Sequence, residues 1–266
     1  MRKLLFASSA LLALTACYNA ETADTAGDGL VDAEETRQGT DMNVADTDGD
    51  GLTDKQEVDL GLNPLVGDTD LDLIGDKEEV DGGSNGNDCT SVPEGYWPNC
   101  LAKAEVDELE GEGWAVDDIM KDWSGFDQFG TEVSLYQFYG SVILLDFSAG
   151  WCGPCNNAAP DQEDLYQEYR DQGFIILHVM VDDNSYDGFV TDENFAEDWA
   201  DEHGLTFPVV IDTSVRGYSE AYFHLYQEGY MDGIPAFAVL GRDMTFVDTW
   251  IGEDESRAVS NIEDLL

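Results

Sequence analysis

The sequence predicts an α/β domain, built on a mixed central sheet flanked by helices, with an acidic repeat segment of little regular structure before it. Two near-continuous apolar runs, residues 141–148 and 174–181, have the composition of buried central strands. The stretch 155–173 between them has the pattern of a helix that ends at a glycine. Upstream, three acidic stretches recur at a fixed spacing, which indicates an internal repeat.

The rest of the α/β domain alternates apolar and amphipathic stretches. A strand–helix alternation that closes with a hairpin and a last helix describes an α/β sandwich. The expected elements are helices over 193–204, 214–229 and 255–266, a short strand over 207–212, and hairpin strands over 235–241 and 244–252.

The chain is strongly acidic, with 58 acidic residues against 11 basic ones and a formal net charge of −47. Nucleic acid and anionic lipid surfaces are therefore excluded as electrostatic partners, whereas cations and basic proteins remain suitable. Solubility in saline surroundings is an alternative reason for the same charge.

The first residues have the organisation of an export signal, with two bases and then an apolar run too short to span a bilayer comfortably. Residues 14–17, LTAC, resemble the lipobox of bacterial lipoproteins. The resemblance implies removal of residues 1–16, lipid on Cys17 and a place in a bacterial cell envelope. Tyrosine rather than aspartate follows Cys17, which favours the outer membrane. The sequence does not decide which face of that membrane the protein occupies. An ordinary signal peptide with an incidental cysteine is the alternative.

Lipid on Cys17 leaves four cysteines, an even number for an oxidising compartment. The simplest pairing joins Cys89 to Cys100 and Cys152 to Cys155. The first pair lies in a segment rich in proline, glycine and asparagine, so we expect a structural bridge that staples a loop. The second pair has a spacing that suits a crosslink, a metal half-site or electron transfer.

The acidic stretches begin at Asp24, Asp46 and Asp68, a spacing of 22 residues. In the second, acids stand at alternating positions, a glycine allows a sharp turn, and a glutamate closes the stretch. This is the oxygen-ligand spacing of a calcium loop, and the crowded carboxylates need a cation to offset their repulsion. The expected ligands are Asp24, Asp28, Asp32 and Glu35; Asp46, Asp48, Asp50, the Leu52 carbonyl, Asp54 and Glu57; and Asp68, Asp70, Asp72, Asp76 and Glu79.

Residues 24–81 resemble the thrombospondin type 3 calcium repeats. The second repeat matches fully, the first has Ala26 in place of one ligand, and the third has Leu73 where a turn glycine is expected. The resemblance implies that calcium orders the segment into a stiff stalk, since it has little apolar content. A solvated, disordered acidic linker is the alternative.

We expect five regions along the chain. The signal peptide is followed by a lipid-anchored tether over 17–23 and by the calcium repeats over 24–81. A linker over 82–113 holds a breaker-rich run and the Cys89–Cys100 loop, and its last part suits a short helix or a charged spacer. The α/β domain occupies 114–266.

Residues 151–155, WCGPC, follow a predicted strand and open a predicted helix. This arrangement resembles the thioredoxin superfamily. The stretches 126–155, 195–212 and 232–252 are similar to thioredoxin-like lipoproteins and cytochrome-maturation reductases of the TlpA/ResA type. The resemblance covers 114–266 and implies a thioredoxin-like fold with thiol–disulfide exchange.

The place of the cysteine pair suits this chemistry. Cys152 would lie at a helix N-terminus, where free N–H groups and the helix dipole favour the attacking thiolate. Cys155, one turn further, would be more buried and would resolve the mixed disulfide. Pro154 costs little in a first helical turn.

Further roles are carried over from the superfamily. Asp146, an acid in an apolar strand, matches the aspartate that aids proton transfer at the second cysteine; its alternative is to face a sheet edge or water. Ile234 and Pro235 match the cis-proline position, which faces the cysteines and offers backbone hydrogen bonds to substrate; a trans proline at a strand start is the alternative. Trp151 would shape the surface beside the first cysteine, and Ser148 departs from the usual aromatic.

Other chemistries are disfavoured for Cys152 and Cys155. A closed zinc site needs four ligands, and His178, His203 and His224 show no ligand spacing. The first of these histidines lies in an apolar strand and is expected to belong to the core. Peroxidase chemistry requires a cysteine in a threonine-rich loop, which this motif does not offer.

We therefore expect a membrane-anchored thiol-disulfide oxidoreductase outside the cytoplasm, with calcium bound and no organic cofactor. Its partners would be proteins with disulfides or thiols and an unidentified redox partner, and the Gly-Pro pair favours a reductase. The competing hypothesis is a non-catalytic calcium-binding surface lipoprotein, in which the thioredoxin fold is a scaffold and Cys152–Cys155 a permanent bridge.

Overall fold

The computed structural model of the chain describes residues 22–93, 95–183, 190, 194–211 and 219–266. The predicted signal peptide, Cys17 and most of the predicted tether lie outside the described residues, as does the start of the helix predicted over 214–229. In the part of the chain that is described, no helix has the length and apolar content to cross a bilayer.

The chain divides into two compact units, residues 1–67 and 68–266. Each acidic repeat is a loop followed by a helix of seven residues. The first two repeats belong to the first unit and the third belongs to the second, so the repeat segment predicted over 24–81 is shared between the units. The helices are α1 (Asp32–Gln38), α2 (Asp54–Leu60) and α3 (Asp76–Gly82).

The spacing of 22 residues also governs backbone contacts beyond the acids. The N–H of Asp54 donates to the carbonyl of Ala45, 3.0 Å away, and so closes the second loop. Two repeat lengths later along the sequence, the carbonyl of Cys89 accepts from the N–H of Asn99 at 3.3 Å. Cys89 is bonded to the adjacent Cys100, and both are buried. Cys89 therefore stands two repeat lengths after Ala45, but the loop that follows it is one residue longer and is closed by a disulfide.

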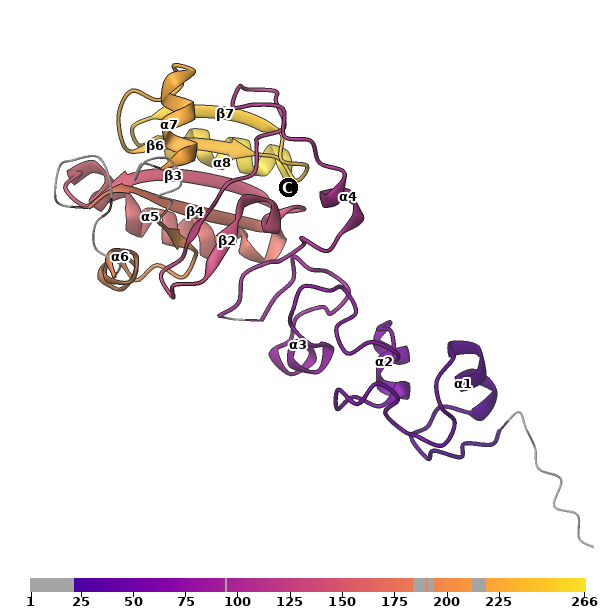
Figure 1. Ribbon diagram of the computed structural model, residues 1–266. Helices are drawn as coiled ribbons and strands as arrows, with labels where there is room; N and C mark the ends of the chain where they lie inside the picture. Colours follow the sequence, from indigo (N-terminus) through magenta and orange to yellow (C-terminus); the bar gives the residue numbers. More distant parts are fainter. Residues whose placement is uncertain (1–21, 94, 184–189, 191–193, 212–218) are drawn as a thin grey trace, which may run out of the picture. The chain divides into compact units, whose positions relative to one another are not determined.

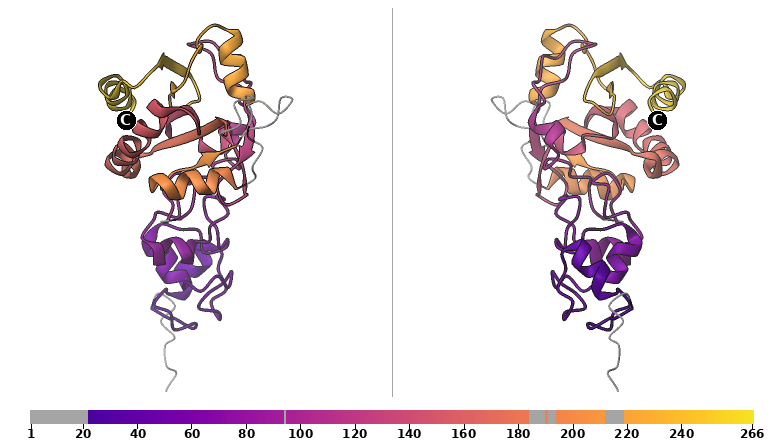
Figure 2. Two further views of the ribbon diagram at one scale, coloured as in Figure 1. Left: turned by 90° about the vertical axis from the view of Figure 1, so that its left-hand side faces the viewer. Right: turned by 90° about the vertical axis from the view of Figure 1, so that its right-hand side faces the viewer.

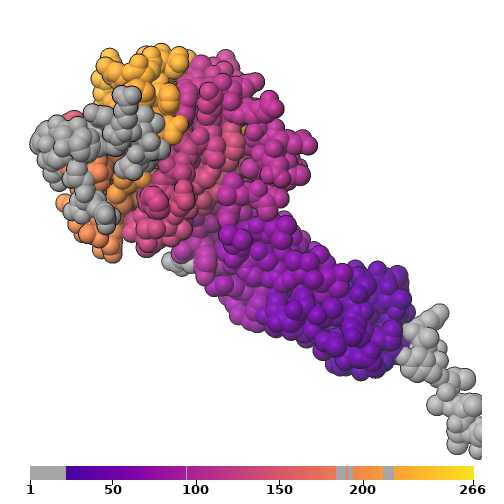
Figure 3. All heavy atoms as spheres, viewed as in Figure 1, coloured from indigo at the N-terminus to yellow at the C-terminus, as the bar shows by residue number. Residues whose placement is uncertain are grey.

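A short helix and a hairpin lead into the main sheet. The linker contains α4 (Ala104–Asp107), and strands β1 (Ser124–Phe126) and β2 (Glu132–Ser134) pair antiparallel before the 3-10 turn η1 (Leu135–Phe138). Single bridges join Ile119 to Thr245 and Phe126 to Ile211. This segment, magenta in the space-filling view, forms part of the surface of the second unit (Figure 3).

The main sheet has five strands in the order β5-β4-β3-β6-β7. β4 runs parallel to β3 and β5, whereas β6 runs antiparallel to β3 and β7. The central strand β3 is buried along its whole length, as its apolar sequence predicts. The strands are β3 (Val142–Ala149), β4 (Phe174–Asp182), β5 (Val209–Val210), β6 (Ala236–Leu240) and β7 (Phe246–Ile251).

Helices cover both faces of this sheet (Figures 1 and 2). On one face lie α5 (Gly153–Tyr169), which continues into the 3-10 turn η2 (Arg170–Gln172), and α8 (Glu255–Leu265). On the other face lies α7 (Glu220–Gln227), and α6 (Phe195–His203) packs against α5 and β5. Because neighbouring residues of a strand point to opposite faces, the side chains of Asp146 and Phe147 on β3 lie on opposite faces of the sheet. The ring of Phe147 contacts Tyr222 of α7 at 5.8 Å between centroids.

Candidate functional site

The cysteine pair lies where the central strand meets its helix. β3 ends at Ala149, α5 begins at Gly153, and Cys152 is the N-cap of α5. The sulfur of Cys152 accepts the backbone N–H of Cys155 at 3.2 Å and is also bonded to the sulfur of Cys155. Cys152 is 3% exposed and Cys155 is fully buried, so attack from outside can reach only the first sulfur.

Residues distant in the sequence surround the pair. Val181, at the end of β4, and Ile234, before β6, pack against the cluster formed by the two cysteines and Ala149. The peptide bond between Ile234 and Pro235 is cis, and Pro235 is buried. Trp151 is 39% exposed on the turn before Cys152. The structure thus brings Ile234 to the cysteines predicted from the sequence.

Asp146 lies on β3 with no exposed surface, so it faces neither a sheet edge nor water. Its Oδ2 is 2.7 Å from Nδ1 of His178, a fully buried residue on β4. The hydroxyl of Ser148 donates to Asp146, at 3.1 Å to Oδ1 and 3.2 Å to Oδ2. A buried carboxylate with these donors keeps part of the stabilisation that water would give it.

His178 and Ser148 are polar partners that the sequence patterns did not assign. His178 is a core histidine, as expected, but it stands opposite Asp146 in the parallel register of β3 and β4. Ser148, noted only as a departure from an aromatic, points to the same face as Asp146 two residues away. The available signal was the one acid in the first apolar run and the one histidine in the second, which this register aligns.

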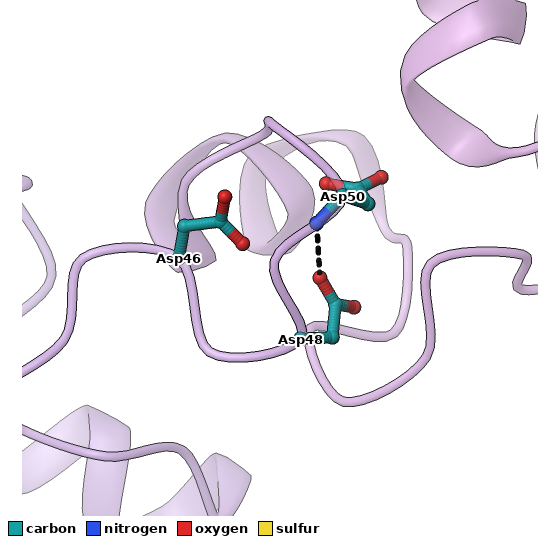
Figure 4. A group of neighbouring side chains, drawn as sticks. All are labelled: Asp46, Asp48 and Asp50. Atoms are coloured by element: carbon teal, nitrogen blue, oxygen red, sulfur yellow. Dashed lines mark hydrogen bonds between the residues drawn. The ribbon is translucent and has the colours of Figure 1, made fainter.

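The second and third acidic loops bring carboxylates together. One oxygen from each of Asp46, Asp48 and Asp50 lies within 4.8 Å of the others, and the carboxylates converge inside the loop (Figure 4). The dashed line marks the backbone N–H of Asp50 donating to Asp48 at 3.2 Å. The third loop repeats the arrangement with Asp68, Asp70 and Asp72. Hard cations that take oxygen ligands suit such groups.

The aspartates at position nine brace the loops. Both oxygens of Asp54 accept hydrogen bonds from Thr47, one from its N–H and one from its hydroxyl, each at 2.8 Å. The same bracing recurs in the other two repeats, where Thr25 contacts Asp32 and Thr69 contacts Asp76. Threonine at position two of all three repeats was the sequence signal for this contact, and the ligand role of these aspartates stays a prediction.

The closing glutamates point inward, because Glu35, Glu57 and Glu79 are all fully buried. At position seven of the second loop, Leu52 is buried and its N–H donates to Asp50 at 2.7 Å. In the first loop, Ala26 removes one carboxylate. Asp28 of the first loop accepts the N–H of Leu30 at 2.8 Å and that of Lys55 at 3.2 Å. The second and third loops, each of which brings three aspartate carboxylates together, therefore form the stronger candidate cation sites.

Packing of the third loop raises the pKa values of its carboxylates. Burial, followed by the charges of Asp70 and Asp72, raises the pKa of Glu79 to about 8. Burial likewise raises the pKa of Asp70 to about 7 and that of Asp72 to about 6. Several buried carboxylate oxygens have no hydrogen-bond partner among the described residues: Glu35 Oε1 and Oε2, Asp50 Oδ2, Asp70 Oδ2, Asp72 Oδ2 and Glu79 Oε2. These oxygens fit a bound cation.

The third loop forms its turn without glycine. Leu71 and Leu73 have positive φ values of 63° and 79°, as do Gly49 and Gly51, at 84° and 107°, which hold the same positions in the second repeat. Left-handed backbone is strained for a side chain with a Cβ atom. Leu73 is 83% exposed, so its side chain gains little packing in return.

Replacement of Leu73 by glycine should therefore stabilise the third loop by about 0.5–1 kcal/mol, since the relief of strain exceeds the added chain entropy. Amide hydrogen exchange across residues 68–79 measures the opening free energy. Leu73→Ala is the matched control: it keeps the Cβ atom and the strain, and should leave this free energy nearly unchanged. An equal rise of the opening free energy in both variants would contradict the explanation by backbone strain.

A mixed sheet with a cysteine pair at the N-terminus of the helix after its central strand, packed beside a residue before a cis proline, defines a thioredoxin-like domain. The chain belongs to the AhpC/TSA family, whose model matches residues 116–248. The bacterial TSP3 repeat matches residues 24–41 and 46–67, the first two acidic repeats. The predicted resemblance to the thioredoxin superfamily, the resemblance of the first two acidic repeats to thrombospondin type 3 repeats, and the predicted fold class are confirmed.

Curated relatives carry the name thiol-disulfide oxidoreductase ResA. The protein from Geobacillus kaustophilus is 37% identical over 98 residues, which cover 37% of this chain and 52% of the relative. The protein from Oceanobacillus iheyensis is 36% identical over 77 residues, which cover 29% of this chain and 36% of the relative. The chain thus spans about a third to a half of the length of these relatives.

Solved structures are similar to the α/β domain. The thioredoxin domain of a thiol-disulfide oxidoreductase from Bacteroides vulgatus is 18% identical, with a TM-score of 0.44, and the match covers 58% of this chain and 99% of that one. The exposed lipoprotein thioredoxin from Streptococcus pneumoniae is 21% identical, with a TM-score of 0.43, and the match covers 55% of this chain and all of that one.

Proposed function

We propose that this protein is a thiol-disulfide oxidoreductase that acts on protein disulfides through Cys152 and Cys155. The observation that carries the proposal is the place of Cys152, which caps α5 at its N-terminus and is bonded to the fully buried Cys155. The helix N-terminus favours a thiolate at Cys152, and burial protects Cys155 from other partners. This asymmetry gives the two sulfurs different roles.

In the reductive direction, the thiolate of Cys152 attacks one sulfur of a substrate disulfide. A bond forms between Cys152 and that sulfur, and the other substrate sulfur leaves as a thiolate that takes a proton from water. The thiolate of Cys155 then attacks the sulfur of Cys152, so that the intramolecular disulfide forms and the substrate leaves as a second thiolate. Two electrons pass from the cysteine pair to the substrate, and the reverse sequence oxidises a dithiol.

The remaining residues of the site support these steps. Asp146, on the strand that leads to the pair, accepts the proton of the Cys155 thiol. Ile234 and Pro235 offer backbone hydrogen bonds to an extended substrate segment, and the partly exposed Trp151 contacts that segment beside Cys152. Packing of Ile234 against the cysteine cluster supports this arrangement.

We further propose that the acidic repeats bind calcium and that calcium stiffens them. The carboxylates at positions one, three and five, the carbonyl at position seven and the closing glutamate would hold the ion, and the buried oxygens without hydrogen-bond partners support this ligand set. When bound, the ion neutralises the crowded carboxylates, and its binding free energy adds to folding free energy. The second loop, with Asp46, Asp48, Asp50 and Glu57, is the best formed.

We also propose a setting for the protein. Lipid on Cys17 would anchor it to a membrane of the bacterial cell envelope, with the outer membrane favoured, and the resemblance of residues 14–17 to a lipobox supports this. There it meets protein disulfides and thiols and a redox partner whose identity is open. The Gly-Pro pair between the cysteines supports reduction as the working direction.

A second function, a non-catalytic surface scaffold, is favoured by the low exposure of Cys152, 3% in the bonded state. Insulin reduction with dithiothreitol as electron donor, together with the reduction potential of the Cys152–Cys155 pair, separates the two functions. An oxidoreductase accelerates insulin reduction and has a bond that dithiols open. A chain without turnover, whose bond withstands dithiols, is a scaffold.

A further inference from the structure

Four polar side chains form a buried cluster on the face of the sheet that α5 covers. Ser148 donates to Asp146, and Asp146 contacts His178. The same Nδ1 of His178 lies 3.1 Å from Oε1 of Gln162 on α5. Each of the four is at most 6% exposed. Such a cluster, inside an otherwise apolar core, is costly unless its hydrogen bonds are made.

The contacts fix the protonation of the histidine ring. Nδ1 of His178 faces two acceptors, Asp146 Oδ2 and Gln162 Oε1, so Nδ1 carries the hydrogen. Nε2 is buried and has no hydrogen-bond partner among the described residues. The rings of Trp199 and Phe207 lie beside the imidazole of His178, with centroids 5.7 and 6.2 Å from its own. A second proton on Nε2 would leave a buried donor unpaired, so the ring is a neutral donor to Asp146.

The cluster extends toward the cysteine pair. Ser148 directly precedes Ala149, which packs against Cys152 and Cys155. On α5, Gln162 lies two helical turns after Cys155, and both residues are on the buried face of that helix. Asp146 therefore lies beneath the helix that carries Cys155, with Ser148 between it and the active-site end of the strand.

We propose that His178 is a positioning residue, which holds Asp146 as an oriented carboxylate, ready to accept the proton of Cys155, by donating an uncharged hydrogen bond from Nδ1. The inference rests on the proposed exchange reaction and goes beyond it by assigning a role to a residue that touches neither cysteine. Ser148 supplies the second donor to Asp146, and Gln162 fixes the tautomer and orientation of the imidazole.

Among the described residues, the titratable groups on the elements around Asp146 include the cysteines of α5, Asp182 at the buried end of β4, and His203 on α6. The cysteines lie at the start of α5. His203 on α6 contacts the ring of Trp199, and burial lowers the pKa of His203. β6 contributes Phe237, which carries no charge, opposite Asp146. A neighbouring cavity between α5 and the start of α8 is lined by the carboxylates Asp161, Glu253, Asp254 and Glu255.

Difference infrared spectroscopy of the full chain tests the proposal. The carbonyl band of protonated Asp146, identified by its loss in Asp146→Asn, is followed against pH in wild type and in His178→Phe. Loss of the donor should raise the midpoint of Asp146 protonation by about one to two pH units, since a hydrogen bond to a charged group contributes that much. His178→Gln keeps a hydrogen-bond donor, so most of the shift should be absent and the midpoint should lie near that of wild type.

His203→Phe is the matched control, because the His203 ring contacts the same Trp199 in a tilted arrangement, at 4.4 Å between centroids, and no contact between His203 and Asp146 is found among the described residues. An unchanged midpoint in His178→Phe, or the same shift in His203→Phe, overturns the proposal. Nitrogen-15 shifts of the wild-type His178 ring provide a test that no folding defect can affect. They should show hydrogen on Nδ1 alone near pH 7, and a doubly protonated or Nε2-protonated ring overturns the proposal.

The activity of the same variants separates this inference from the proposed function. With exchange activity present, His178→Phe should slow insulin reduction and shift its pH profile by the same number of pH units as the infrared midpoint. A wild type without exchange activity refutes the proposed function, while the infrared and nitrogen measurements still decide how His178 acts on Asp146. A parallel loss of rate at every pH would mark a merely structural role and overturn the proposal.

Discussion

Replacement of Cys152 by serine is expected to lower insulin reduction to the background rate of dithiothreitol alone. Serine at this position is not ionised near neutral pH, and the buried Cys155 has no exposed surface with which to replace the nucleophile. The turbidity of reduced insulin at equal protein concentration measures the loss. Retention of most of the wild-type rate by Cys152→Ser would show that another group carries the reaction.

Cys155→Ser should also abolish turnover, but it should trap substrates. Without the second sulfur, the mixed disulfide on Cys152 cannot be resolved and accumulates. Non-reducing electrophoresis and mass spectrometry of the full chain identify the trapped partner, and Cys152→Ser is the control that traps nothing. Adducts of equal yield in both variants would point to Cys89 or Cys100 and contradict the assigned order of attack.

Removal of calcium should produce the second large effect, a loss of order in the acidic repeats. At calcium one hundredfold above its dissociation constant, each site adds about 2.7 kcal/mol of stability. Chelation should therefore reduce the helical circular dichroism that α1, α2 and α3 contribute, and it should lower the thermal stability of the full chain. A spectrum unchanged between chelator and millimolar calcium would favour an acidic linker that takes no metal.

Glu57→Gln tests the second loop, because it removes the charge of the buried closing glutamate. Calorimetric titration should show one calcium site fewer, or one weakened about a hundredfold, as expected when a buried bidentate ligand is lost. Asp59→Asn is the matched control. It removes the same charge from the same helix, but at an exposed position that pairs with Lys55. Equal losses of calcium binding in both variants would show that the overall negative charge of the helix, and not Glu57 as a ligand, determines the affinity.

The apolar strands and the repeats could be predicted because their signals are local. The strand predicted over 141–148 is β3 (Val142–Ala149). The helix predicted to end at Gly173 is α5, which ends at Tyr169 and continues as η2 up to Gly173, where the backbone is left-handed with φ of 81°. Continuous apolar sequence marks a buried strand, and a fixed spacing marks a repeat, whatever the rest of the chain does. The hairpin of β1 and β2 was missed because strands of three residues carry no periodic signal.

The partners of Asp146 could not be predicted, because they depend on how two strands align. His178 meets Asp146 only in the observed register of β3 and β4, and a shift of one residue would turn it to the other face. Gln162 joins them from a helix whose docking angle the sequence does not specify. Even so, two buried polar residues in paired apolar runs are a usable sign of such contacts.

The step from acidic repeats to a disulfide loop has a consequence for how the chain responds to its surroundings. Ala45 precedes an acidic loop, and Cys89, two repeat lengths later in the sequence, precedes a loop closed by a disulfide. Under the proposed calcium binding, the acidic loops exchange their ions with the medium, and their order follows its calcium content. The covalent bond to Cys100 has no such dependence. The loop nearest in sequence to the thioredoxin-like domain is therefore closed by a bond that only a reductant opens. Under the proposed calcium binding, the acidic loops further away in sequence depend on the calcium supply instead.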